Sequence, residues 1–233
     1  MSPTLDLSGL TPALLERYDR PGPRYTSYPT APHFNDAFDE TAYRERLHTA
    51  SQRADEPLSM YVHLPFCHER CTFCGCNVVI SPRRGPEEDY LDTLETELDL
   101  VCEALAPRRR LSQLHWGGGT PTYLSPEQCT RLFEAITSRF PLADDAEVAI
   151  ETDPCVTTME HLETLSRLGF NRLSMGLQDT NPEVQAAVKR IQPLELTKEH
   201  VVEARRLGFE SVNIDLIYGL PLQTEASFRD CVR

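Results

Sequence analysis

The sequence of 233 residues contains no uninterrupted run of 18 apolar residues, which excludes a membrane-spanning helix within it. Positive charge is scarce, because 23 Lys and Arg face 36 Asp and Glu and leave a net charge of −13. Such acidity argues against a nucleic-acid partner and against an anionic membrane surface. The first residues lack the basic start and apolar stretch of a signal peptide. We therefore expect a cytoplasmic, monomeric protein that binds neither nucleic acid nor membrane.

Cysteine is concentrated in one place, since four of the eight cysteines lie within ten residues. These four are Cys67, Cys71, Cys74 and Cys76. The first three, spaced C-x3-C-x2-C, put three thiolates on one short loop. Three thiolates can ligate three corners of a four-iron cubane and leave one iron open to an exogenous ligand. The remaining cysteines are scattered and are expected to be small core residues: Cys102, Cys129, Cys155 and Cys231.

Two other interpretations of the cysteine loop remain open. A structural zinc site would use Cys71, Cys74, Cys76 and either His63 or His68. Structural zinc sites usually combine two separated pairs of ligands, and a second pair is missing here, whereas Phe66 and Phe73 surround the loop with apolar groups. Alternatively, all four cysteines ligate a complete cluster. Because the step from Cys74 to Cys76 is short, we expect Cys76 to face the site without binding iron.

Hydrophobic periodicity from residue 58 onward predicts strands that alternate with helices. The predicted strands are 58–64, 111–116, 147–151, 172–176 and 211–218, and the predicted helices are 87–105, 125–140, 158–168, 182–189, 197–207 and 224–233. This alternation predicts an α/β fold, with a parallel sheet and right-handed crossovers that curves towards a barrel. We expect residues 1–57 to be an N-terminal extension over the active site, and 58–233 to be an incomplete barrel truncated at its C-terminus.

Unusual residues follow the predicted strands at the edge where β/α barrels carry their active sites. The cysteine loop follows the first strand, and Gly117-Gly118-Gly119-Thr120 follows the second. Glycines without Cβ would let backbone amides approach a small ligand, although a plain turn is the alternative. Glu151 is a candidate acceptor for a cationic ligand. Asp215, between two apolar residues, is expected to be buried and bonded to a polar or cationic partner.

The motifs resemble those of the radical S-adenosylmethionine (SAM) enzymes. Cys67-x3-Cys71-x-Phe73-Cys74 resembles their cluster loop, and the glycine run resembles their SAM ammonium-binding motif. Narrower runs at 23–30, 61–67 and 213–221 are similar to the N-terminal half of the oxygen-independent coproporphyrinogen III oxidase family.

This resemblance implies a partial (β/α) TIM-like barrel that holds a 4Fe–4S cluster and two molecules of SAM. It implies cluster ligation by Cys67, Cys71 and Cys74. It also implies SAM contacts at Tyr61, Phe73, Gly118, Gly119, Thr120, Glu151, Gln178, Arg190 and Asp215. No catalytic residue is assigned.

The activity that the resemblance implies is the conversion of two propionate side chains of coproporphyrinogen III to vinyl groups, giving protoporphyrinogen IX without oxygen. A low-potential donor such as flavodoxin or ferredoxin would supply electrons. A haem chaperone of the same superfamily, or a non-enzymatic Fe–S or zinc scaffold, is the alternative. Since the substrate carries four carboxylates, Arg24 and Arg190 are candidates to bind them. The alternative interpretation of Arg190 is a solvated side chain without a role in binding. Arg108, Arg109 and Arg110 are expected to form a solvated helix end.

Overall fold

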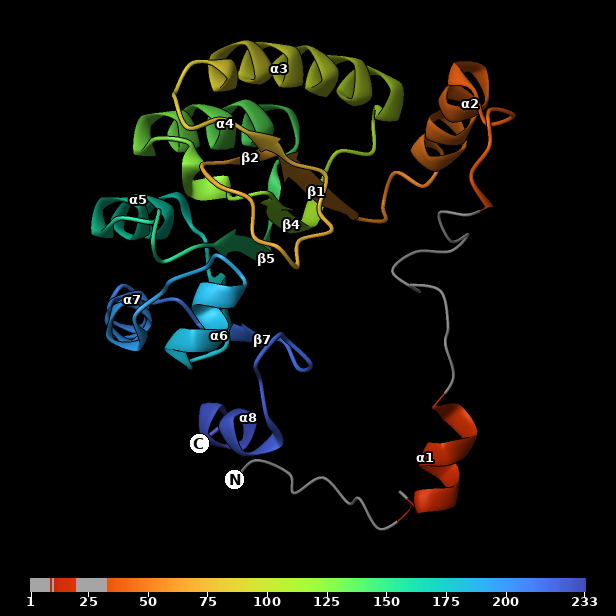
Figure 1. Cartoon of the computed structure of the whole chain (residues 1–233). Helices are drawn as coiled ribbons and strands as arrows, with labels where there is room; N and C mark the ends of the chain where they lie inside the picture. Colours follow the sequence, from red (N-terminus) through yellow and green to blue (C-terminus); the bar gives the residue numbers. More distant parts are fainter. Residues whose placement is uncertain (1–8, 10, 20–32) are drawn as a thin grey trace. The chain divides into compact units, whose positions relative to one another are not determined.

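We describe a computed structural model of the chain that covers residues 9, 11–19 and 33–233 (Figure 1). The chain divides into two compact units, Met1–Glu45 and Arg46–Arg233. In the first unit, α1 (Pro12–Tyr18) begins where the Thr11 hydroxyl accepts a hydrogen bond from the Leu14 amide, an N-cap that its sequence favours. Arg24 and the run 23–30 lie outside the described residues. The predicted boundary at residue 57 stays a prediction.

The second unit is built on a five-stranded parallel sheet with strand order β1-β4-β5-β6-β7. Its strands are β1 (Leu58–Leu64), β4 (Leu111–Gly118), β5 (Leu142–Thr152), β6 (Arg172–Gln178) and β7 (Ser211–Leu216). Two short strands, β2 (Phe66–Cys67) and β3 (Val79–Ile80), form a separate parallel pair. Because spatial order follows chain order, each crossover moves one strand along, as in a (β/α) barrel. The predicted α/β partial barrel is confirmed.

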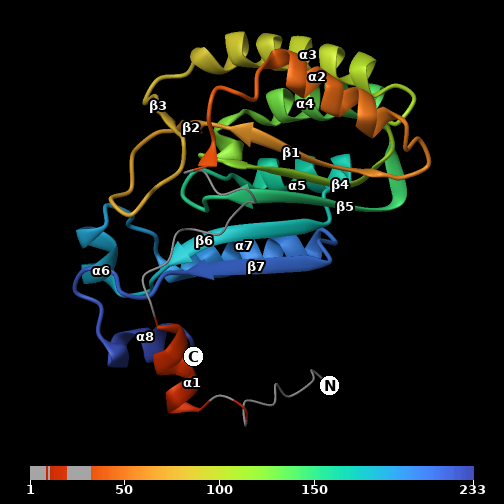
Figure 2. The same ribbon diagram turned by 90° about the vertical axis from the view of Figure 1, so that its right-hand side faces the viewer.

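The crossover helices line up along one face of the sheet (Figures 1 and 2). They are α3 (Pro86–Leu105), α4 (Pro126–Arg139), α5 (Met159–Leu168) and α7 (Leu194–Arg206). The other helices lie elsewhere in the chain order: α2 (Glu40–Ser51) precedes β1, η2 (Pro121–Tyr123) follows β4, α6 (Pro182–Ala187) follows β6 and α8 (Glu225–Cys231) follows β7. Between helices and sheet, Leu114, Trp116, Ile150 and Leu173 are fully buried. Among the described residues, no helix combines the length and apolar character needed to cross a bilayer.

Local signals placed the helix ends well. Ser125 and Gln128 form a capping box at the start of α4, and Gly169 ends α5 in the left-handed conformation with φ 97°. The strand β5 was predicted too short, since it begins at Leu142, which pairs with Leu111 of β4. The strand therefore includes Asp144 and Asp145, which the apolar pattern cannot count, and its register with β4 is irregular between Leu142 and Glu147.

Arg108 corrects one expectation, because it is buried rather than solvated. Its guanidinium donates hydrogen bonds to the carbonyl oxygens of Glu56 (2.8 Å), Pro57 (2.9 Å) and Ala50 (3.3 Å). Arg109 and Arg110 are exposed, as expected. Arg108 therefore holds the segment that leads into β1 against the base of the sheet.

Replacing Arg108 with alanine should lower the free energy of unfolding by about 2–3 kcal/mol, because three carbonyls lose a charged donor. Urea denaturation followed by circular dichroism would measure the change. Arg109→Ala is the matched control, and we expect it to stay within about 0.5 kcal/mol of the parent chain. Equal stability of the two variants would contradict the role assigned to Arg108.

Candidate functional site

The cysteine loop is closed at its base by the β2–β3 pair. The Val79 amide donates to the Pro65 carbonyl at 2.8 Å, and the Ser81 amide donates to the Cys67 carbonyl at 2.9 Å. Further along, the Thr72 amide donates to the carbonyl of Val188, just beyond α6, at 3.1 Å. The loop is thus fixed at both its base and its tip, which gives its thiols a defined place above the sheet.

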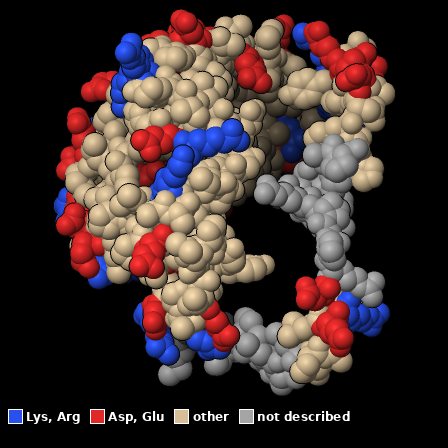
Figure 3. All heavy atoms as spheres, viewed as in Figure 1, with Lys and Arg blue, Asp and Glu red and all other residues tan. Residues whose placement is uncertain are grey.

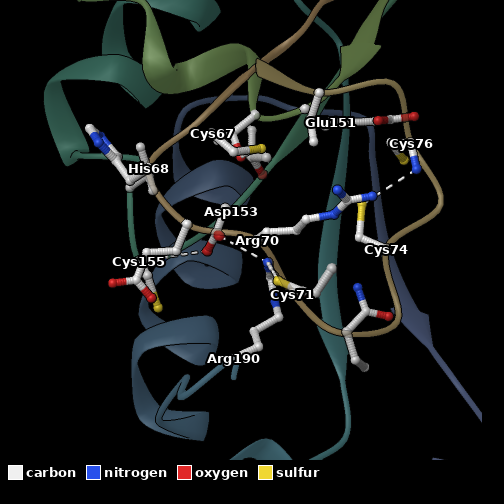
Figure 4. A pocket seen from close by; sticks show the side chains of 18 of the residues that line it. Cys67, His68, Arg70, Cys71, Cys74, Cys76, Glu151, Asp153, Cys155 and Arg190 are labelled. Carbon is white, nitrogen blue, oxygen red and sulfur yellow. Dashed lines mark hydrogen bonds and ion pairs between the residues drawn. The ribbon is translucent and has the colours of Figure 1, made fainter. Parts of the chain in front are cut away.

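A cavity of about 510 Å³ lies between this loop and the C-terminal ends of the strands (Figure 4). Most of the residues predicted to bind cluster or SAM line it: Cys67, Cys71, Phe73, Cys74, Gly118, Gly119, Thr120, Glu151, Gln178, Arg190 and Asp215. Tyr61 is the exception. Residues separated by up to 148 positions in the chain therefore meet in one cavity, on the edge of the sheet that barrel topology predicts.

Each of the three thiols has a hydrogen-bond donor beside it. The Cys67 sulfur lies 3.6 Å from the Thr120 hydroxyl, the Cys74 sulfur accepts from the Cys76 amide at 3.4 Å, and the Cys71 sulfur lies 3.9 Å from Arg190 Nη1. Burial raises the pKa of the Cys67 thiol. The hydrogen bond from Thr120, or a bound metal, is therefore needed to favour the Cys67 thiolate. Donors to the sulfurs are also one of the means by which a protein sets the reduction potential of an iron–sulfur cluster.

Among the residues described, no three His, Cys, Asp or Glu side chains are grouped so that they could hold a single metal ion. A structural zinc ion needs four such ligands at one centre. A four-iron cubane instead takes one thiolate at each ligated corner, so its cysteines stand apart. The donor set of three separate thiols around one cavity fits a cubane cluster.

Cys76 is exposed and also lines the cavity. Burial and the neighbouring Cys74 raise the pKa of the Cys76 thiol to about 11. At neutral pH this thiol is therefore protonated in the cluster-free chain. That it faces the site without binding iron remains a prediction.

The glycine run fits against the end of β1 with no room for side chains. A Cβ on Gly119 would lie 2.7 Å from the carbonyl oxygens of both Pro65 and Phe66. The backbone amides are used within the chain, since Gly119 donates to the Leu64 carbonyl (2.8 Å) and Thr120 to that of Phe66 (2.8 Å). We expected these amides to face a ligand. Instead they hold the cysteine loop against β4, so the glycines are needed for close packing of two backbones.

Glu151 is the anionic group on this wall of the cavity. Its carboxylate accepts from the Gly118 amide (3.3 Å) and lies 3.3 Å from His115 Nε2. The hydrogen bond from His115 is the largest cause that lowers the pKa of Glu151 below its ordinary value. The carboxylate stays charged at neutral pH and suits a cationic ligand.

Tyr61 lies behind Glu151 rather than in the cavity. Its ring stacks on His115 with centroids 5.8 Å apart, and its hydroxyl lies 3.1 Å from His63 Nδ1. His63 Nε2 in turn lies 2.8 Å from the carbonyl oxygen of Asn77, so it is the protonated nitrogen, and Nδ1 accepts from the Tyr61 hydroxyl. In this structure Tyr61 is connected to the site through His115, whose Nε2 lies beside the Glu151 carboxylate. Direct contact between Tyr61 and SAM remains a prediction.

Arg190 is not solvated, because its side chain is only 13% exposed. Its Nη1 makes an ion pair with Asp153 at 2.9 Å, and its Nη2 donates to the Gly176 carbonyl at 2.8 Å (Figure 4). This pairing corrects the idea that Arg190 is a free cation for a substrate carboxylate. Two exposed cations that the sequence did not single out, Arg70 and Lys189, line the cavity instead.

Asp215 and Cys155 also differ from expectation. Asp215 is exposed, and it accepts from Ser174 Oγ (3.1 Å) and Asn213 Nδ2 (2.7 Å). β7 is an edge strand, and its alternate residues, including Asp215, are exposed while the residues between them are partly buried, so apolar chain neighbours do not bury this side chain. Cys155 is exposed in the cavity rather than packed in the core, and its place just after β5 was the available signal. Gln178 lines the cavity with φ 68°.

Residues 61–233 match the sequence profile of the radical SAM superfamily. Two relatives, both named oxygen-independent coproporphyrinogen III oxidase, come from Synechocystis sp. and Escherichia coli. The first is 43% identical over 231 residues, which cover 99% of this chain and 49% of that protein. The second is 48% identical over 216 residues, which cover 93% and 46%. The chain spans about half the length of the relatives it matches.

Among solved structures, that of coproporphyrinogen III oxidase from Escherichia coli, described as a radical SAM enzyme, superimposes with a TM-score of 0.84 at 46% identity, and the match covers 94% of this chain and 48% of that one. A radical SAM methyltransferase from Kitasatospora setae matches with a TM-score of 0.51 at 18% identity, over 76% of this chain and 31% of that chain. This second likeness concerns the fold alone.

Proposed function

Because the chain belongs to the radical SAM superfamily, we propose that it holds a 4Fe–4S cluster and SAM in the cavity between the cysteine loop and the strand ends. We propose further that it serves the oxygen-independent oxidative decarboxylation of coproporphyrinogen III to protoporphyrinogen IX. The observation that carries the proposal is the arrangement of Cys67, Cys71 and Cys74 around one cavity that the charged carboxylate of Glu151 also lines.

When bound, cluster and SAM would supply a one-electron cleavage able to open an unactivated carbon–hydrogen bond, and the chain would supply position and a dry environment. Glu151 would hold the ammonium group of SAM. The ion pair of Arg190 with Asp153 would fix the side of the cavity next to Cys71. Phe73 packs against the apolar residues Val184, Val188 and Leu220, and this packing would keep water away from the side of the cavity that Phe73 lines.

The relatives support the narrower activity by their names and by an identity of 43–48%. Coproporphyrinogen III as substrate, a second SAM molecule and an electron donor such as flavodoxin or ferredoxin are therefore part of the proposal. Cationic groups must receive the substrate carboxylates. Of the described cations that line the cavity, Arg70 and Lys189 have no ion pair. We therefore propose that Arg70 and Lys189 bind the substrate carboxylates.

Reconstitution with iron and sulfide under argon tests the proposal in two stages. We expect a brown protein whose EPR spectrum changes when SAM is added, and which releases methionine and 5′-deoxyadenosine with dithionite. Mass spectrometry of coproporphyrinogen III incubated with it should then detect protoporphyrinogen IX. A colourless zinc protein would refute the cluster, whereas SAM cleavage with haem binding and no decarboxylation would favour the chaperone.

A further inference from the structure

The turn between β3 and α3 presents arginines on the surface beside the cysteine loop. Arg83 and Arg84 are consecutive and exposed, and Arg70 is exposed on the loop itself. None of the three makes an ion pair within the described part of the chain, whereas Arg131 and Arg139 on α4 are paired with carboxylates of α3. Figure 3 shows Lys and Arg side chains interspersed with acids on the face of the molecule that it presents.

The first turn of α3 carries three acids beside these arginines, Glu87, Glu88 and Asp89, and the first two are engaged by other groups. Glu87 is buried and accepts from the Gly85 amide at 2.7 Å, and Glu88 is held by Arg131 at 3.0 Å. Glu69 is the exposed acid within the segment 68–85, which carries three arginines against that single carboxylate. Positive charge therefore exceeds negative charge within the segment 68–85, on a chain whose net charge is −13, and Asp89 is an exposed acid of α3 that follows it.

The arginine turn, Ser81–Gly85, is held by hydrogen bonds to Tyr123 and is connected to Cys67. The Tyr123 hydroxyl lies 3.1 Å and 3.0 Å from the carbonyl oxygens of Ser81 and Arg83, and Ser81 Oγ donates to the same Arg83 carbonyl at 2.6 Å. The Ser81 amide donates to the carbonyl of Cys67. A partner that docks on this turn is thus one backbone hydrogen bond from the cluster loop, without entering the cavity.

Contacts around Tyr123 join the turn to the cysteine loop. The Arg84 guanidinium lies 5.4 Å from the Tyr123 ring centroid, and the ring of His68, the residue after Cys67, lies 4.7 Å from it. Val79 and Ile80 next to the turn are 47% and 41% exposed. Exposed apolar residues inside a charged rim are typical of interfaces between proteins.

We propose that the arginine turn, Ser81–Gly85 with Arg83 and Arg84 at its tip, is the docking surface for an acidic electron-carrier protein. This proposal rests on the proposed function and adds the place where the electron enters. The flavin or iron–sulfur centre of the carrier would be oxidised by one electron, and the cluster that Cys67, Cys71 and Cys74 would hold would be reduced by it, with no bond made or broken. Opposite charges on the two surfaces accelerate the encounter and orient it.

The test compares two double charge reversals in the reconstituted protein. Arg83→Glu/Arg84→Glu changes the proposed surface and leaves Arg70, which lines the cavity, untouched. Arg109→Glu/Arg110→Glu is the matched control, because it makes the same charge change at exposed residues before β4, at the opposite end of the parallel strands. Iron content and dithionite-driven 5′-deoxyadenosine release should be equal in both variants and the parent, since dithionite needs no docking surface.

Reduced flavodoxin is the probe, and stopped-flow absorbance of the cluster gives the second-order rate of reduction. At low ionic strength, Arg83→Glu/Arg84→Glu should be reduced at least about tenfold more slowly than the control pair, and the difference should shrink as salt rises. If both pairs slow alike, or neither does, the docking surface is wrong.

Calorimetric titration of oxidised flavodoxin into the same proteins keeps this test separate from the proposed function. If no cluster assembles, the proposed function fails. In that case binding that is lost in Arg83→Glu/Arg84→Glu alone still supports the surface, and binding that is absent from the parent, or equal in both variants, overturns it.

Discussion

Replacing Cys71 with alanine should leave the chain unable to retain a four-iron cluster. The predicted ligands of the cluster are three thiolates, those of Cys67, Cys71 and Cys74. Among them, Cys71 lies beside the buried guanidinium of Arg190. With two ligands left, we expect the iron content after anaerobic reconstitution to fall from about four to below one per chain. SAM-dependent release of 5′-deoxyadenosine should drop below detection. Iron and sulfide analysis with EPR would measure both effects.

Cys155→Ala is the control for this prediction, since Cys155 is an exposed thiol in the same cavity. Its sulfur lies 3.5 Å from the Ile191 carbonyl and is outside the C-x3-C-x2-C spacing. We expect parental iron content in this variant. If Cys155→Ala lost its iron while Cys71→Ala kept it, the ligand set would be wrong. Circular dichroism of both apo-proteins separates loss of ligation from loss of folding.

Replacing Glu151 with glutamine should weaken SAM binding by about 10- to 150-fold. The amide keeps the size of the side chain but loses the charge, and a hydrogen bond to a charged group contributes about 1.5–3 kcal/mol. Calorimetric titration of SAM into the reconstituted protein would measure the affinity. Glu147→Gln is the matched control on the same strand, because Glu147 is bound by Gln113 and Arg172 and does not line the cavity. Equal losses in both variants would show that strand stability, not ligand contact, is responsible.

The pH dependence of this effect follows from the lowered pKa of Glu151. A carboxyl with a depressed pKa is ionised throughout the range above its ordinary value, and its advantage is lost only as pH falls through the lowered pKa. The ratio of affinities between parent and Glu151→Gln should therefore stay constant from pH 8 to pH 6. A ratio that collapses in this range would mean that the carboxylate is not the group that SAM contacts.

Local sequence accounts for much of the fold. The capping box at Ser125 and the glycine stop at Gly169 are decided by residues within one turn of each other, so the sequence was sufficient to place them. The strand β5 extends beyond its apolar pattern because its first residue, Leu142, pairs with Leu111 of β4. Pairing between strands is a long-range property, and no periodicity within the strand reports it.

In the functional site too, some features follow from local sequence and others depend on contacts between distant segments. Cysteine spacing and strand-end position pointed to one cavity, because parallel strands bring their C-terminal ends to one edge. What the spacing could not reveal was which groups pair with which. Arg190 is neutralised by Asp153, 37 residues away, and the amides of the glycine run are used by the exit of β1.

The amino-acid sequence alone determined the order of strands and helices, the three spaced thiols and the superfamily, since each depends on residues close together in the chain. The tertiary structure decided that Arg108 is buried, that Asp215 is exposed, and that the turn carrying Arg83 and Arg84 is bound to Cys67 through the Ser81 amide. Burial and charge pairing are set by segments that meet only after folding, and for that reason composition and periodicity did not contain them.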